Sequence, residues 1–323
     1  YYNAIINWVK QRYDLIVTKE VINFVPGIVP GIGMAMNCFT QKGDKVMIQP
    51  PVYHPFAWVT TRNERTLVIN PLKWENGMYR MDLDAFREQI KGCKLFILCN
   101  PHNPGGVVWT EAELRAIADI CYDEKVLVFS DEIHADLTLP PHTHRPFATV
   151  SEKARMNSVT FMSPSKAFNM PGLSASHALI FNEDLRKRFR IYMDAGELDM
   201  GHVFAFLSVE AAYSHGTEWL DQCLAYIQGN IDFVDEFLKK HAPKIKAIRP
   251  EASYLVWLDC RELELSQKDL NEFFVDKAHL ALNDGEMFGK EGIGFMRLNV
   301  ASPRCIIEKA MKQLADAYQL YIK

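Results

Sequence analysis

Short apolar runs alternate with amphipathic stretches along the first two-thirds of the chain. The runs have the length and the Val, Ile, Leu and Phe content of buried strands. We expect strands at residues 45–49, 66–70, 94–99, 126–130, 158–162 and 178–181. Helical periodicity predicts helices at 54–63, 82–90 and 111–124, with Asp82 and Thr110 as N-caps of the last two. This alternation predicts an α/β fold, with a mainly parallel (mixed) sheet sandwiched between helices.

The pattern changes after about residue 215. One long helix is expected at residues 218–241, and the strands and helices that follow no longer alternate regularly. The expected strands are 246–249, 254–259 and 294–300, and the expected helices are 268–278 and 303–321. We therefore predict a large domain at residues 1–217 and a smaller α+β domain at 218–323, which agrees with the length of 323 residues.

Composition indicates which binding partners and which cellular compartment to expect. A net charge of −4 gives no electrostatic support for binding nucleic acid or an anionic membrane. No apolar run approaches the ~20 residues that span a bilayer. Seven scattered cysteines without a Cys-x-x-Cys pair favour a reducing compartment, so a cytoplasmic protein is expected. Residues 1–9 already have a helical pattern and no initiator Met, so we expect an N-terminal segment to be missing from this sequence.

The segment 163–169 (Ser-Pro-Ser-Lys-Ala-Phe-Asn) carries the most informative lysine. Lys166 follows a predicted strand and precedes apolar residues, and an amine removed from water tends to lose its proton and become a nucleophile. Ser163 and Ser165 could donate hydrogen bonds to an anion beside it. This pattern indicates a Schiff-base lysine next to a bound phosphate. The alternative is a lysine at a helix start behind a serine cap.

Polar residues follow three of the predicted strands. They lie at 99–106, 130–134 and 163–166. Ligands in open α/β sheets bind at the carboxyl ends of the strands, so we expect the three segments to meet at one edge. Asp131 comes directly after an apolar strand, where a buried carboxylate needs a cationic partner such as a protonated ring nitrogen. A helix N-cap is the alternative for Asp131. Asn103 could hydrogen-bond a ring oxygen or serve only as a turn residue.

Three further positions carry candidate chemistry. The Gly-Pro loop at 24–33 precedes a predicted helix, whose first N–H groups could bind phosphate. Tyr53 could lie flat over an aromatic ligand or pack in the core. Arg297 lies among apolar neighbours in a predicted strand and needs a carboxylate, which a substrate or a structural ion pair could supply.

Together these residues resemble the fold-type I pyridoxal-phosphate (PLP) enzymes of the aminotransferase class I/II superfamily. The branch that they resemble is that of the cystathionine β-lyases (C–S lyases) of the MalY/PatB type. The resemblance rests on residues 50–56, 99–104, 130–134, 163–173, 283–289 and 296–301, in family order. It extends over essentially the whole chain, and it implies a PLP-dependent-transferase-like fold.

The resemblance implies a role for each candidate residue. Lys166 would hold pyridoxal 5'-phosphate and act with Tyr53 in catalysis. The implied cofactor-binding residues are Lys166, Asp131, Asn103, His134, Tyr53, Ile28, Val29 and Ser163. Arg297 would bind the substrate carboxylate. His134 and Ser174 replace a Tyr and a phosphate-binding Arg of the aspartate aminotransferases, as in the C–S lyase branch.

The implied activity is β-elimination from L-cystathionine or a related cysteine S-conjugate, which yields a thiol, pyruvate and ammonia. An aminotransferase is the main alternative, and a non-catalytic regulator on the same fold is another. The resemblance also implies a homodimer with a shared active site and a small amino-acid substrate. A metal site formed by His134, His142 and His144 is a further alternative, although no carboxylate at ligand spacing completes it.

Overall fold

A seven-stranded mixed sheet organises the first part of the computed structural model, which describes residues 1–321. Its order is β1 (Ile22–Val25), β9 (Ser176–Leu179), β8 (Ser158–Met162), β7 (Leu127–Asp131), β6 (Cys93–Cys99), β2 (Lys45–Ile48) and β3 (Thr66–Ile69). Strands β3, β2, β6, β7 and β8 are parallel to one another. Strand β9 runs antiparallel to both of its neighbours. The sheet is therefore mainly parallel, as the sequence predicts.

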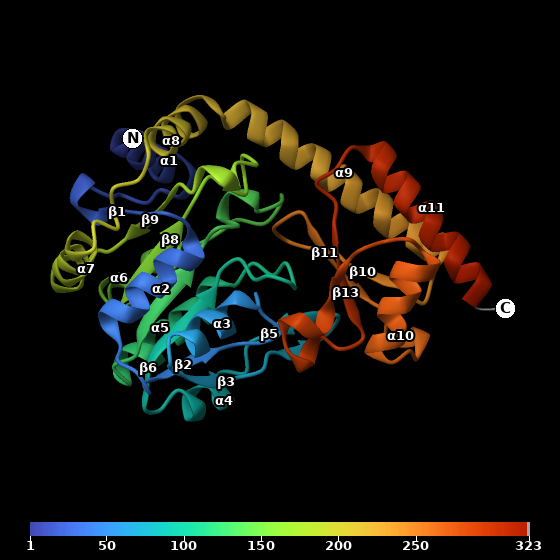
Figure 1. Ribbon diagram of the computed structural model, residues 1–323, viewed down its shortest axis with the longest axis horizontal. Helices are drawn as coiled ribbons and strands as arrows, with labels where there is room; N and C mark the ends of the chain where they lie inside the picture. The colour runs from blue at the N-terminus through green and yellow to red at the C-terminus, as the bar shows by residue number, and fades with distance from the viewer. Residues whose placement is uncertain (322–323) are drawn as a thin grey trace.

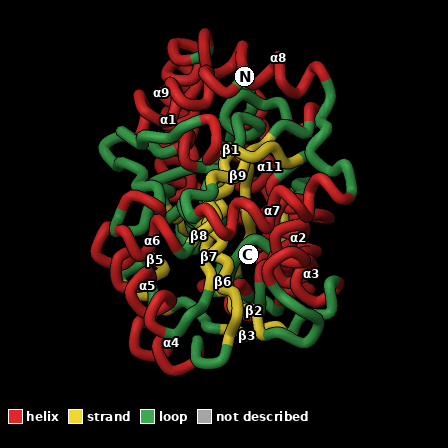
Figure 2. Tube along the Cα trace, turned by 90° about the vertical axis from the view of Figure 1, so that its left-hand side faces the viewer, coloured by secondary structure: helices red, strands yellow, loops and turns green. Residues whose placement is uncertain are grey.

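Helices cover both faces of this sheet (Figure 2). One face carries α4 (Leu83–Gln89), α5 (Glu111–Asp123) and α6 (Glu152–Met156), and the other carries α2 (Ile28–Phe39), α3 (Pro55–Arg62) and α7 (Glu183–Ala195). Side chains of β6 alternate between the two cores, with Phe96 in one and Ile97 in the other. The strands are buried on both faces for this reason, which explains their continuous apolar runs.

Three helices link the sheet to the rest of the molecule. α1 (Tyr2–Tyr13) packs on α8 (Val203–His215), where Trp8 stacks on Tyr213 with ring centroids 4.8 Å apart. α9 (Thr217–His241) then runs from α8 along the upper side of the molecule to the second sheet (Figure 1). None of the described helices is both long and apolar enough to cross a bilayer.

The second sheet is antiparallel throughout. Its order is β10 (Lys246–Ile248), β11 (Leu255–Asp259), β13 (Phe295–Asn299) and β12 (Asn283–Asp284). α9, α10 (Gln267–Glu272) and α11 (Arg304–Tyr321) share its core. β4 (Lys73–Glu75) and β5 (Met78–Arg80) form a hairpin that pairs with neither of the two sheets. The predicted α+β character is confirmed, and the exact division at residue 217 stays a prediction.

Short helical turns complete the chain. The 3-10 turns are η1 (Lys19–Val21), η2 (Ala135–Leu137), η3 (Phe147–Thr149), η4 (Pro171–Leu173), η5 (Arg261–Leu263), η7 (Gly285–Phe288) and η8 (Lys290–Gly292). The helix expected at 268–278 is α10 followed by a π-helical turn, Phe273–Lys277. The strand expected at 178–181 is β9, which begins two residues earlier. The sequence analysis missed β1, β4, β5, β12, α6, α7 and α8.

Candidate active site

The three polar segments meet where β6, β7 and β8 end side by side. Cys99 pairs with Asp131, and Asp131 pairs with Phe161, so the ends of the three strands lie level. A cavity of about 470 Å³ opens at this edge. The candidate residues that line it are Ile28, Val29, Tyr53, Asn103, Asp131, His134, Lys166 and Arg297. The structure thus brings together residues that are up to 269 positions apart in the sequence.

Lys166 lies in an irregular turn between β8 and η4. The N–H of Phe168 donates to the carbonyl of Pro164 at 2.9 Å, and the turn does not continue into a regular helix. The alternative of a lysine at a helix start is therefore wrong. The side chain is partly exposed and lines the cavity. Its charge acts on Asp131, on the next strand of the sheet.

Asp131 is the last residue of β7 and is 3% exposed. Within residues 1–321 its carboxylate receives one hydrogen bond, from the N–H of Ile133 to Oδ1 at 3.1 Å. It caps no helix, so the N-cap alternative is wrong. Burial raises the pKa of Asp131 to about 7, while the Ile133 hydrogen bond and the Lys166 charge oppose this rise. A cationic partner in the cavity would stabilise the charged form, as a protonated ring nitrogen would.

The N-terminus of α2 presents two free donors to the cavity. The first N–H groups of a helix have no intrahelical partners. Pro30, the third residue of α2, has no N–H group. Ile28 and Val29 therefore carry the free N–H groups of this turn. Gly27 precedes them with a φ of 136°, which a side chain would strain. The arrangement suits a phosphate group.

Arg297 reaches the cavity from β13 of the second sheet. Its Nη1 donates to Oδ1 of Asn103 and its Nη2 to Oδ1 of Asn283, both at 2.8 Å. Its Nε is buried without a partner among the described residues, and no carboxylate there forms an ion pair with it. Burial lowers the pKa of Arg297 to about 10. The structural ion pair is therefore absent from residues 1–321, and the guanidinium keeps capacity for a ligand carboxylate.

Three neighbours complete the polar wall. Oδ1 of Asn103 accepts from Arg297, so its amide N–H₂ is the part that can serve a ligand oxygen. His134 is buried with Nδ1 unpaired among the described residues, and burial lowers its pKa to about 3. Its ring is therefore neutral near pH 7. Tyr53 is half-buried, and its ring lies at 87° to that of Phe56.

Ser163 does not line the cavity. Its Oγ is buried, donates to the carbonyl of Ala175 at 2.8 Å and accepts from the N–H of Ser165. Its only hydroxyl hydrogen is therefore used inside the protein, which corrects the expected phosphate contact. Ser165 and Ser174 line the cavity instead. A sequence pattern could not distinguish Ser163 from Ser165, because both flank Pro164 after the strand.

The alternative metal site finds no support in the geometry. His144 donates or accepts through Nε2 with Glu132 at 2.8 Å, and His142 lies 3.7 Å from Glu251. Within residues 1–321 no group of three or more His, Cys, Asp or Glu side chains is arranged to hold a metal ion. His134 lines the cavity with Lys166 rather than joining the other two histidines.

Comparisons with known proteins agree with this geometry. The family model described as aminotransferase class I and II matches residues 1–314. The chain belongs to this family. It is 38% identical over 317 residues to cystathionine beta-lyase PatB of Bacillus subtilis, a match that covers 98% of this chain and 82% of PatB.

Solved structures extend the family assignment to the whole fold. Cystalysin from Treponema denticola, which contains a pyridoxal 5'-phosphate cofactor, superimposes with a TM-score of 0.97 at 34% identity. That match covers 100% of this chain and 82% of cystalysin. The PLP-bound C–S lyase from Staphylococcus hominis gives 0.91 at 33% identity, covering 98% and 83% of the two chains. The predicted fold class and family resemblance are confirmed.

Pyridoxal 5'-phosphate fits the residues of this cavity. The buried carboxylate of Asp131 suits a protonated ring nitrogen, and the free N–H groups of Ile28 and Val29 suit a phosphate. Nδ1 of His134 is a buried polar atom without a partner in the described part of the chain. The donors and acceptors present therefore match the two polar ends of the cofactor.

The sequence analysis missed some residues of the site. His54, Tyr254, Asn283 and Asn299 also line the cavity. Asn283 could have been found from the sequence, because it is the first residue of the family segment 283–289. In the structure its Oδ1 accepts a hydrogen bond from Arg297. Tyr254 gave no signal, since an aromatic residue in a predicted strand is usually a core residue.

Proposed function

We propose that this protein is a PLP-dependent C–S β-lyase that acts on L-cystathionine or related cysteine S-conjugates. One observation carries the proposal: Lys166, Asp131 and Arg297 converge on a single cavity, in a chain that is 38% identical to a cystathionine β-lyase. The proposal gives each of these residues a role and makes a small amino acid the substrate.

Arg297 orients the substrate. Its guanidinium binds the α-carboxylate in the bidentate manner that two parallel N–H groups allow. Asn103 and Asn283 hold the guanidinium plane through Nη1 and Nη2, so the carboxylate meets a fixed partner. The α-carbon is thereby held close to Lys166, and correct orientation removes much of the entropic barrier to proton transfer.

Lys166 acts as the base. Its amine removes the proton from Cα, since it is the lining side chain that can both hold the cofactor and accept a proton at that carbon. Bound pyridoxal phosphate supplies the electron sink that takes up the resulting charge. The carboxylate of Asp131 favours a proton on the ring nitrogen beside it. The side chains of Tyr53 and Ile133 also line this cavity.

Elimination then breaks the Cβ–S bond. The electron pair of the Cα–H bond becomes a Cα=Cβ bond, and the sulfur leaves as a thiolate with the electrons of its former bond. Water converts the remaining three-carbon fragment to pyruvate and ammonia. An aminotransferase shares the first proton transfer but needs a keto acid as acceptor. Among the relatives above, PatB and the Staphylococcus protein are named lyases, which favours elimination.

The test is pyruvate release from L-cystathionine by the holoenzyme without any keto acid. We expect steady pyruvate formation with one thiol per pyruvate. Lys166→Ala should abolish it, because both the cofactor anchor and the base are removed. Lys153→Ala, a surface lysine paired with Asp119 and Asp123, is the matched control and should keep full activity. Pyruvate that forms only after a keto acid is added would instead establish the aminotransferase.

We also infer a homodimer. Four apolar side chains on α8 and the segment before it are more than half exposed, namely Met200, Val203, Phe204 and Leu207. Such a cluster is typical of an interface. Nε2 of His202 contacts the carbonyl of Leu173 at 2.9 Å, so the cluster adjoins the segment that follows Lys166. This position supports an active site shared between subunits. The seven unpaired cysteines support a cytoplasmic location.

A further inference from the structure

We propose that an apolar groove between α3 and residues 286–291 binds the sulfur substituent of the substrate, and that it selects cysteine conjugates with uncharged hydrocarbon or aryl substituents. The inference rests on the proposed lyase function, because it concerns the part of the substrate that leaves as a thiol. The groove has a volume of about 450 Å³. That is enough room for a ring or a branched chain.

The walls of the groove come from four elements and one loop. β2, α3, β3, η7 and the loop between β2 and α3 contribute mostly apolar side chains, among them Val52, Trp58, Leu67, Ile69, Met287 and Phe288. Trp58, Ile69 and Met287 are each more than a third exposed, although a large apolar side chain is stable when covered. A hydrocarbon substituent would cover them and gain free energy by doing so.

His54 connects the groove to the cavity that holds Lys166. It lines both spaces. Its ring lies 4.4 Å from that of Trp58 and 5.9 Å from that of Phe288. The guanidinium of Arg297 lies 4.6 Å above the same Phe288 ring. The groove therefore begins one aromatic ring away from the group that binds the carboxylate.

The stereochemistry of proton removal also points to this groove. Cα carries an amine, a carboxylate, a hydrogen and the Cβ–S chain. With the carboxylate on Arg297 and the hydrogen directed at Lys166, the Cβ–S chain has to leave on the side away from Lys166. His54, which lines both spaces, follows Tyr53 in the loop before α3, and no residue of the Lys166 turn lines the groove.

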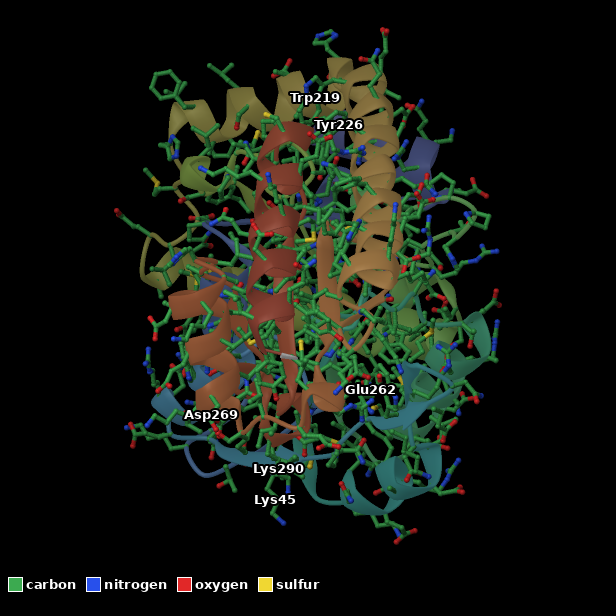
Figure 3. The ribbon with its side chains drawn as sticks, turned by 90° about the vertical axis from the view of Figure 1, so that its right-hand side faces the viewer. Lys45, Trp219, Tyr226, Glu262, Asp269 and Lys290 are labelled. Carbon is green, nitrogen blue, oxygen red and sulfur yellow. The ribbon has the colours of Figure 1, made fainter. Side chains whose placement is uncertain are left out.

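A second cavity provides the natural comparison. It has about 280 Å³ and is lined by Lys166, Trp219 and Tyr226 among others. This cavity opens beside Lys166 itself, whereas the groove has no lining residue from the turn of Lys166. Figure 3 shows Trp219 and Tyr226 on α9 at one end of the molecule and Lys290, a residue of the groove, at the other.

Charge distinguishes the substituents that the groove accepts. Its charged lining residues, Glu286, Lys290 and Glu291, all belong to one segment, and the other walls are apolar except at His54. A charged substituent would lose hydration against the apolar walls without full compensation. The distal amino-acid end of L-cystathionine carries both an ammonium and a carboxylate. Conjugates such as S-benzyl-L-cysteine should therefore react with a higher kcat/KM than L-cystathionine.

The test compares two tryptophans of equal exposure. Trp58 is 47% exposed and lines the groove, whereas Trp219 is 50% exposed and lines the second cavity. Pyruvate release would be measured for the holoenzyme with S-benzyl-L-cysteine, L-cystathionine and S-methyl-L-cysteine. Trp58→Ala should lower the S-benzyl to S-methyl ratio of kcat/KM about tenfold, the usual effect of lost apolar contact in a pocket. Trp219→Ala should leave that ratio unchanged.

Ile69→Lys provides a second variant on an exposed edge strand. The added ammonium should lower the same ratio, because it places a charge against the hydrocarbon substituent in the groove. The inference would be overturned if the wild type preferred L-cystathionine, or if Trp219→Ala alone lowered the S-benzyl to S-methyl ratio of kcat/KM. Neither result would contradict the proposed lyase activity. Absence of pyruvate from all three conjugates would instead overturn the proposed function.

Discussion

At the scale of single residues, the buried Asp131 determines how the proposed cofactor reacts. Its carboxylate has one hydrogen bond within the described chain and otherwise faces the cavity. Asp131→Asn keeps the shape of the side chain but removes the charge that favours a protonated ring nitrogen. We expect kcat/KM for pyruvate release to fall by about 10²- to 10³-fold, the range for the loss of one group that stabilises charge during the reaction.

Asp136 is the matched control for this substitution. It is also a buried aspartate, but it accepts hydrogen bonds from Trp8 and Tyr13 and does not line the cavity. Asp136→Asn should lower the melting temperature and change kcat/KM little. Equal activity of Asp131→Asn and the wild type would remove Asp131 from the mechanism.

His177 makes the stability of the protein sensitive to acid. It is completely buried, neither ring nitrogen has a partner within residues 1–321, and burial lowers its pKa from 6.5 to about 3. The unfolded chain therefore binds a proton that the folded chain excludes, so stability present above pH 6.5 is lost as the pH falls toward 3. This residue alone should reduce the free energy of unfolding by on the order of 1–2 kcal/mol between pH 6.5 and 5.

Denaturant unfolding at both pH values measures this effect. His177→Leu should show a smaller loss of stability on acidification than the wild type. His215→Leu, at the exposed end of α8, should leave the loss unchanged. An identical pH dependence for wild type and His177→Leu would show that His177 is protonated without cost.

Single residues also show what the sequence could predict of the site. Lys166, Asp131 and Arg297 stand out because a charged residue among apolar neighbours needs a partner, and the structure places all three on one cavity. Ser163 was misplaced because the direction of a hydroxyl depends on the fold, here on the carbonyl of Ala175 twelve positions away.

At the scale of elements, the first turn of α2 is the candidate phosphate site. Gly27 adopts a φ of 136° directly before Ile28 and Val29, the first residues of α2, which line the cavity. Gly27→Ala would strain this turn by about 1–3 kcal/mol and displace the donors. We expect weaker binding of pyridoxal phosphate, by roughly tenfold or more, in a titration of the apoprotein followed by fluorescence.

A substitution at Gly43 distinguishes the effect of backbone strain from an effect on the phosphate site. It also has a positive φ, 87°, but lies in a turn before β2 with open space around it. Gly43→Ala should destabilise the fold to a similar extent and leave the affinity for pyridoxal phosphate unchanged. If both variants bind the cofactor equally well, the turn of α2 does not hold the phosphate.

The sequence predicted best the strands whose apolar pattern results from burial alone. β6, β7 and β8 are buried on both faces, and their apolar runs located each within one residue. β9 was shifted by two residues because it contains the polar Ser176 and His177, which are nevertheless buried. α8 was missed because apolar residues occur on several of its faces, including the exposed Phe204 and Leu207, so no single stripe marks it.

At the scale of the whole molecule, the exposed cluster on α8 predicts a dimer. Phe204→Asp places a charge at the centre of the proposed interface, where it would have to be desolvated. We expect the variant to elute as a monomer in size-exclusion chromatography with light scattering, and to lose activity in proportion. Leu320→Asp, on the exposed face of α11, should remain dimeric. A monomeric wild-type holoenzyme would contradict the proposal.

The division of the molecule into two sheets was predictable, whereas their connection was not. The loss of regular alternation after residue 215 marks the change from the parallel sheet to the antiparallel one. Contacts across the division, such as that between Arg297 and Asn103, join residues 194 positions apart. Periodicity is a local property and contains no information on such distant pairs.

Because β6, β7 and β8 end level with one another, the activity of the protein depends on the correct register of these strands. Adjacent residues in a strand point to opposite faces, so a slip of one position would put Ser130 in the place of Asp131 and turn the carboxylate to the opposite face of the sheet. A misaligned sheet could still be compact and rich in secondary structure, but it would not catalyse elimination. Turnover is therefore a direct assay of correct strand pairing, and recovery of activity after refolding measures the fraction of chains that reached it.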